Sequence, residues 1–146
     1  MPEREGTPFE LEIPAKAKYV GLARLLAGSI ARRMHFSEES IDDLKLAISE
    51  VCTNAIVHTG NGEGEKPPIL VRYLAGKGFI TVEVKDQGPG FDPSCILDRE
   101  REGLISKGFG IPLIKSLVDV FECDSHPQAG TTVTITKFLK PEKDEL

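Results

Sequence analysis

The chain has 146 residues, 40% of them hydrophobic and 28% charged, which is typical of one globular domain large enough to bury a core. Its net charge of −5 argues against nucleic acid as the main partner, because binding to phosphates favours a basic surface. No stretch of the sequence approaches the ~18 consecutive apolar residues of a membrane span, so we expect no membrane contact.

The first half of the chain is predicted to form one strand and two helices. A strand near 9–13 precedes a helix over about 15–34, which Pro14 begins. Ser37 is the expected N-cap of the second helix, with two acids in a first turn where the helix dipole favours them. The predicted core stripe of that helix consists of Ile41, Leu44, Ile48, Val51 and Ala55. A second stripe at the edge of the buried face consists of Asp43, Ala47, Glu50, Asn54 and His58.

The second half is predicted to form a sheet that one helix interrupts. The expected segments are a connector over 60–64, a hairpin of strands 69–75 and 79–85, a charged mobile segment over 92–107, a helix over 111–117, and strands near 120–125 and 132–138. The order β-α-α-β-β-α-β-β predicts an α/β two-layer sandwich, with helices on one face of a mixed, mainly antiparallel sheet.

The second helix carries the first motif. Glu50, Asn54 and His58 are spaced i, i+4 and i+8, so they rise along one stripe of a helix. A carboxylate one turn before a carboxamide can deprotonate a nucleophile beside a metal ion that the carboxamide oxygen holds. Because exposed Glu and Asn are common on helices, this spacing alone proves little.

Two glycine-rich turns strengthen the interpretation. Asp86 ends an alternating strand and begins the turn Asp86-Gln87-Gly88-Pro89-Gly90, where a fixed carboxylate can accept a hydrogen bond from an exocyclic amino group. The second turn, Gly108-Phe109-Gly110, precedes a helix whose first turn suits Pro112. Glycines that lead into a helix N-terminus present free N–H groups, which make an anion site suitable for phosphate.

In order and spacing, these three elements resemble the N, G1 and G2 boxes of the GHKL ATPases, the superfamily that includes gyrase and the histidine kinases. Within it, the chain is most similar to the small bacterial anti-sigma factor serine-protein kinases of stress-response and sporulation switches. Segments 10–15, 19–25, 43–55 and 130–137 also look like that family. The resemblance covers about residues 8–139 and implies the Bergerat fold for a single domain, 1–146, with a charged tail over 140–146.

The resemblance implies a site for ATP and Mg²⁺. It makes Glu50 the general base, Asn54 the Mg²⁺ ligand and Asp86 the adenine acceptor. The remaining implied nucleotide-binding residues are Gly88, Gly90, Lys107, Gly108, Phe109, Gly110, Thr131 and Thr132. Which threonine supports the adenine pocket stays open, and Lys107 is either a phosphate contact or a solvated residue. The role of His58 stays open: it is either a structural histidine or a residue near the phosphates. The role of Arg24 stays open as well, between contact with a partner protein and simple exposure to solvent.

The resemblance implies that the protein switches between two protein partners. The protein would bind a sigma factor, phosphorylate a serine of a STAS-type anti-sigma factor antagonist, and form a homodimer. The alternative is a nucleotide-binding regulatory protein of the same fold without kinase activity, against which the intact Glu50 argues. A sensor histidine kinase is a weaker alternative, since no helical hairpin that could carry a phospho-accepting histidine is evident.

Location and redox state follow from other features. Residues 1–6 have no apolar signal core, so we expect a cytoplasmic protein. The final residues, 143–146, match an endoplasmic-reticulum retention signal, which we interpret as chance. Cys52, Cys95 and Cys123 are widely spaced and are expected to be reduced and mostly packed.

Overall fold

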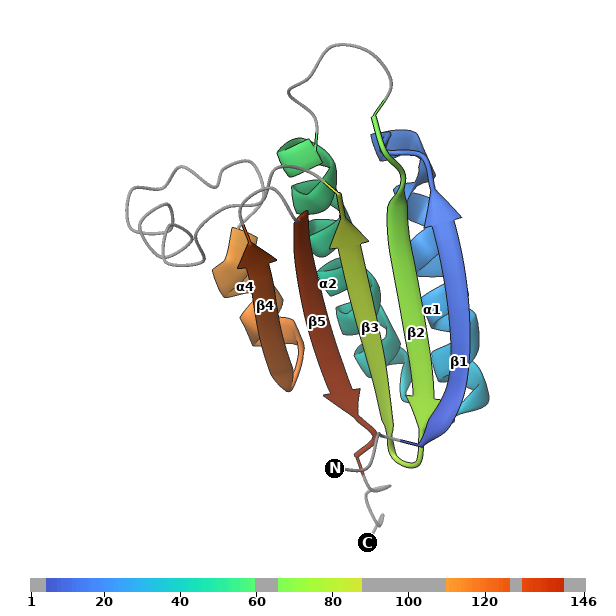
Figure 1. The fold of residues 1–146 in the computed structure, drawn as a ribbon. Coiled ribbons are helices and arrows are strands. Elements are labelled where there is room, and N and C mark those ends of the chain that lie inside the picture. Colours follow the sequence, from blue (N-terminus) through green and yellow to red (C-terminus); the bar gives the residue numbers. More distant parts are fainter. Residues whose placement is uncertain (1–4, 60–65, 88–109, 127–129, 141–146) are drawn as a thin grey trace, which may run out of the picture.

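The computed structural model describes residues 5–59, 66–87, 110–126 and 130–140. In chain order the elements are β1 (Gly6–Ile13), the 3₁₀ turn η1 (Ala17–Tyr19), α1 (Val20–Arg33), α2 (Glu38–Thr59), β2 (Ile69–Gly76), β3 (Phe79–Asp86), α4 (Gly110–Leu117), β4 (Val120–His126) and β5 (Gly130–Phe138). The strands form one layer, and α1, α2 and α4 cover one of its faces (Figure 1). The predicted two-layer α/β sandwich is therefore confirmed.

The sheet has the strand order β1-β2-β3-β5-β4, and every neighbouring pair is antiparallel. The prediction of a mainly antiparallel sheet is confirmed, and the described residues contain no parallel pair that would make the sheet mixed. The two strands joined through α4, β3 and β4, run in the same direction, but β5 lies between them and pairs with both (Figure 1). Because β5 returns antiparallel to each neighbour, no parallel pair forms in this part of the chain.

The first helix begins later than predicted. Instead of a helix from residue 15, the chain forms η1 and then α1 from Val20. Lys16 has an extended backbone, and its N–H donates to the Pro14 carbonyl in a turn, which delays the helix. The predicted β2–β3 hairpin is confirmed, with Gly76 opposite Phe79 and Gly78 at a φ of +81°.

The core lies between the sheet and the helices. The five predicted core residues of α2 are all buried, and they pack against buried residues of β3 such as Val82 and Val84. Tyr73 of β2 is also buried, and its hydroxyl donates to the Ala23 carbonyl of α1 at 2.9 Å. These contacts fix α1 and α2 against the sheet and thereby fix the face of α2 that carries Glu50 and Asn54.

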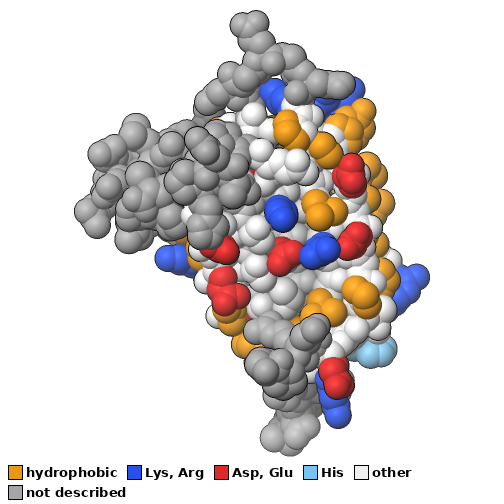
Figure 2. Space-filling model, viewed as in Figure 1, with side chains coloured by type: hydrophobic (Ala, Val, Ile, Leu, Met, Phe, Trp, Pro, Cys, Tyr) orange, Lys and Arg blue, Asp and Glu red, His pale blue; other side chains and the backbone are white. Residues whose placement is uncertain are grey.

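The face of the sheet that the helices do not cover, seen in Figure 2, carries charged side chains among scattered hydrophobic ones. Arg72 of β2 lies 3.0 Å from Glu10 of β1 and 3.7 Å from Glu83 of β3. Exposed ion pairs of this kind contribute little to stability. None of the helices in the described ranges is long and apolar enough to cross a bilayer.

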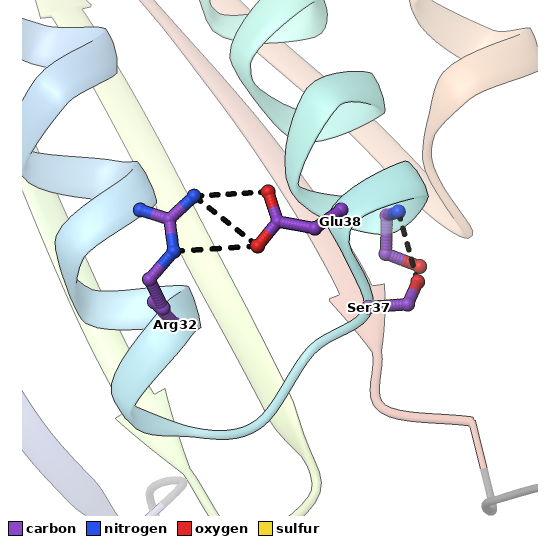
Figure 3. A network of polar contacts seen from close by, with 4 residues as sticks. Arg32, Ser37 and Glu38 are labelled. Carbon is purple, nitrogen blue, oxygen red and sulfur yellow. Dashed lines mark hydrogen bonds and ion pairs between the residues drawn. The ribbon is translucent and has the colours of Figure 1, made fainter.

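The start of α2 is capped as predicted (Figure 3). The Ser37 hydroxyl accepts a hydrogen bond from the Ser40 N–H at 3.1 Å, which satisfies one of the free donors in the first turn. Across the turn from α1, the Arg32 guanidinium donates to the Glu38 carboxylate at 3.0 Å. This exposed pair lowers the pKa of Glu38 through the hydrogen bond and the charge of Arg32.

Replacing Ser37 by alanine removes that cap. We expect Ser37→Ala to lower the free energy of unfolding by about 1 kcal/mol, since the Ser40 N–H loses its acceptor. Urea unfolding followed by circular dichroism measures the change. Ser37→Asp keeps an acceptor at the same place and serves as the control. A Ser37→Ala protein as stable as the parent would contradict the capping role.

Candidate nucleotide site

The helix α2 presents Glu50 and Asn54 at the edge of its buried face. Ile48 and Val51, on the core stripe, are almost fully inaccessible, whereas Glu50 and Asn54 are half-buried. Ala47 lies one turn before Glu50 and two turns before Asn54, and it is fully buried. The two polar side chains therefore lie at the boundary between the core and solvent, as the helical spacing predicts. His58 falls within α2, but its side chain is outside the described part of the structure.

Asp86 ends β3 on the face that the helices cover. It follows Ile80, Val82 and Val84 in the inward-facing alternation, and only 2% of the residue is exposed. Its cross-strand partner on β5 is Thr131, which is equally buried. A carboxylate and a hydroxyl thus lie opposite each other at one end of the buried sheet face.

The two candidate threonines lie on opposite faces of the sheet. Thr131 faces the helices with Asp86, whereas Thr132 pairs with Lys85 and Asp124 on the outer face. Only Thr131 therefore lies on the same face as Asp86, whereas the sequence alone did not distinguish Thr131 from Thr132 as the threonine of the adenine pocket.

Ser125 of β4 is a third polar residue in this row, and sequence reasoning missed it. It is buried, pairs with Thr131 in the β4–β5 register, and its hydroxyl lies 2.7 Å from the Thr131 hydroxyl. The sequence does hold a signal, because alternation along β4 puts Ser125 on one face with Phe121 and Cys123. That signal becomes useful only once β4 is known to pair with β5.

Carboxylates on two strands, β3 and β4, affect the thiol of Cys123, which lies beside the row of Asp86, Thr131 and Ser125. Cys123, two residues before Ser125, has its thiol pKa raised by burial first, and then by the negative charges of Asp124 and Asp86. The thiol of Cys52 on α2 is buried, and its pKa is raised by burial to about 12. Cys52 and Cys123 are free thiols, as expected, and the raised pKa makes Cys52 unreactive. Cys95 lies outside the described residues.

Two glycines shape the backbone next to Asp86 and α4. Gly130, just before Thr131, has a φ of +88°, and a Cβ there would lie 2.3 Å from the Asp86 carbonyl oxygen. Gly110 is the first residue of α4 and has a φ of +62°. Any larger residue at 130 would strain the backbone and push it away from β3. The close approach of β5 to the end of β3 therefore requires glycine.

The described site elements meet at one end of the molecule. The C-terminal half of α2, the end of β3, the start of β5 and the start of α4 all lie there (Figure 1). Gly88, Gly90, Lys107, Gly108 and Phe109 lie outside the described residues, as does the charged segment over 92–107. Of the predicted site residues that the structure describes, Glu50 and Asn54 lie in the C-terminal half of α2, Asp86 and Thr131 pair across β3 and β5, and Gly110 begins α4. Thr132 lies on the outer face of the sheet.

The residues present fit a nucleotide with a magnesium ion. A buried carboxylate beside hydroxyls suits a base with an amino group, and the start of a helix suits phosphate. Within the described residues, no group of three His, Cys, Asp or Glu side chains is placed to hold a metal. Mg²⁺ usually binds through one or two protein oxygens together with substrate phosphates, so a single amide oxygen from Asn54 suits such an ion.

Comparison with known proteins defines the class. Residues 13–137 match the family described as the histidine kinase-like ATPase domain. The RsbU and RsbW domains of a Mycobacterium tuberculosis protein superpose with a TM-score of 0.66 at 23% identity, over 91% of this chain and 32% of that one. The histidine kinase domain of a blue-light activated histidine kinase of Erythrobacter litoralis superposes with a TM-score of 0.57 at 22% identity, over 87% of this chain and 62% of that one. The fold is thus that of an ATPase domain of the histidine kinase type, which implies ATP as the nucleotide. The chain spans about a third of the length of the first of these two solved structures and less than two thirds of the second.

Curated relatives narrow the class. The serine-protein kinase RsbW of Bacillus pumilus is 37% identical over 92% of this chain and 88% of the relative. Those of Bacillus subtilis and Listeria monocytogenes are 34% and 35% identical, again over 92% of this chain. The chain therefore belongs to the RsbW serine-protein kinase family. The predicted resemblance to serine-protein kinases is confirmed.

Proposed function

We propose that the chain is an ATP-dependent serine-protein kinase that also acts as an anti-sigma factor. The observation that supports the proposal is the buried pair of Asp86 and Thr131 in a member of a kinase family. This pair lies at the end of the sheet where the C-terminal half of α2, the half that carries Glu50 and Asn54, also ends (Figure 1). Its substrate is a serine on a STAS-type anti-sigma factor antagonist, and its second partner is a sigma factor. The kinase is a homodimer in the cytoplasm.

The adenine end of the site is formed by the sheet. The Asp86 carboxylate accepts a hydrogen bond from the amino group of the base, and burial keeps water from competing for that oxygen. Thr131, opposite Asp86, supports the same pocket, and its hydroxyl is oriented by Ser125 at 2.7 Å. Gly88 and Gly90 allow the base to approach the backbone. In this assignment Thr132, on the outer face, has no role in base binding.

The phosphate end is formed by the helices. The N-terminus of α4, at Gly110, favours negative charge. We assign phosphate binding to Gly110 together with Lys107, Gly108 and Phe109, which precede it in the sequence. The Asn54 side-chain oxygen would hold Mg²⁺, and the ion would supply positive charge that neutralises the phosphates. Glu50, one turn before Asn54 on the same stripe, takes the proton of the attacking serine hydroxyl as general base.

A mass-spectrometric experiment tests the proposal. The purified protein is used to capture partners from a bacterial lysate, with ATP·Mg²⁺, with ADP·Mg²⁺, or with ATP and EDTA. Capture of a sigma factor and of a small antagonist that gains phosphoserine only with ATP·Mg²⁺ supports it. Capture of the same partners without phosphoserine, by protein shown to bind ATP, rejects the kinase and supports a binding switch. Light scattering gives the oligomeric state, and a monomer rejects the homodimer.

A further inference from the structure

A buried lysine lies at the other end of the strand that carries Thr131. Lys137 is on the inward face of β5, where it pairs with the buried Ile80, and only 5% of it is exposed. The pattern of this face predicts an apolar residue, because Ile135 and Val133 precede Lys137 on it. Since burying an ammonium group is costly unless it has partners, the contacts of this lysine have to offset a large desolvation penalty.

The first partner is the end of α4. The Lys137 ammonium donates to the carbonyl oxygen of Leu117, the last residue of that helix, at 2.8 Å. The last carbonyl oxygens of a helix receive no hydrogen bond from an N–H group of the same helix, and they carry partial negative charge. A buried cation at this place therefore caps α4 and stabilises its end.

The second partner lies on α2. The Lys137 ammonium is 4.0 Å from a carboxylate oxygen of Asp43, whose side chain is 39% exposed. Asp43 belongs to the same stripe of α2 as Glu50, seven residues or about two turns earlier. One side chain of the sheet thus contacts both the helix that begins at Gly110 and the helix that carries Glu50 and Asn54.

We infer that Lys137 is a positioning residue for the phosphate end of the nucleotide site, because it fixes α4 relative to α2 through Leu117 and Asp43. It lies far from that end, since α4 is eight residues long, or about 12 Å. Its effect is therefore transmitted by a rigid helix, whose N-terminus contacts phosphate. This inference rests on the proposed ATP site.

The inference predicts a selective effect on phosphate binding. Without Lys137 the start of α4 is less well held, whereas the base is held by Asp86 and Thr131 on the sheet. We expect Lys137→Met to raise the Kd of ATP·Mg²⁺ about tenfold, which is about 1.4 kcal/mol of binding free energy. The Kd of adenosine, which lacks phosphates, stays within about twofold.

Isothermal titration calorimetry with both ligands measures this ratio, and thermal unfolding is measured in parallel. Lys137→Arg keeps a cationic donor and is expected to restore most of the ATP affinity. The matched control is Lys115→Met, which removes an exposed cation from the last turn of the same helix. Equal weakening of ATP and adenosine by Lys137→Met, or an equal effect of Lys115→Met, overturns the inference.

A second variant covers the case in which Lys137→Met does not fold. Asp43→Asn keeps the bond from Lys137 to Leu117 and removes only the charge on α2. A weaker ATP affinity with unchanged adenosine affinity supports the inference, and an unchanged ratio overturns it. If the parent protein binds adenosine and ATP equally, the phosphate site of the proposed function itself fails, which is a distinguishable result.

Discussion

Replacing Glu50 by glutamine is expected to reduce the rate of phosphotransfer by about 10²–10⁴-fold while the Kd of ATP stays within about twofold. The substitution preserves the shape and the half-buried place of the side chain on α2. It removes only the ability to take a proton from the serine hydroxyl. The adenine contacts of Asp86 and the phosphate contacts of α4 are unchanged, so nucleotide binding is retained.

Single-turnover transfer from ATP to the captured antagonist measures the rate, and calorimetry measures the affinity. Glu39→Gln, an exposed acid in the first turn of the same helix, is the matched control and is expected to transfer phosphate normally. Equal transfer rates for Glu50→Gln and the parent would exclude Glu50 as the base. A parallel loss of ATP affinity would mean that the glutamate contributes to binding rather than to proton transfer.

Several parts of this fold were predictable because they depend on local periodicity. The core stripe of α2 repeats with the helical period, and all five of its residues are buried. The alternation over 79–85 predicted a strand that ends at Asp86, and Asp86 is the last residue of β3. Ser37 was recognisable as a cap from its position before two acids.

Other parts depend on which strands are neighbours, and local patterns do not contain that information. The mixed sheet was expected because the order of elements does not reveal that β5 lies between β3 and β4. Ser125 was missed for the same reason, since its partner Thr131 is known only from that pairing. Lys137 was missed because a lysine in a strand is ordinarily assigned to the exposed face. Its burial follows from two helices meeting over β5.

The adenine assignment makes the other large prediction. Replacing Asp86 by alanine is expected to weaken ATP binding on the order of 100-fold, because the base loses a charged acceptor at a buried position. Phosphotransfer at low ATP concentration falls by a similar factor. Asp86→Asn keeps the size of the side chain and one acceptor oxygen, so it is expected to bind ATP with an intermediate affinity.

The control for Asp86→Ala needs a carboxylate at the same end of the sheet but on its other face. Asp124 meets this condition, because it pairs with Thr132 on the outer face while Ser125 and Thr131 face the helices. Asp124→Ala is therefore expected to leave the Kd of ATP unchanged. Thermal unfolding of all variants separates lost binding from lost folding. An Asp86→Ala protein that remains folded and binds ATP as tightly as the parent would refute the adenine assignment. An Asp124→Ala protein with a weaker ATP affinity would show that net charge, rather than the buried acceptor, determines the affinity.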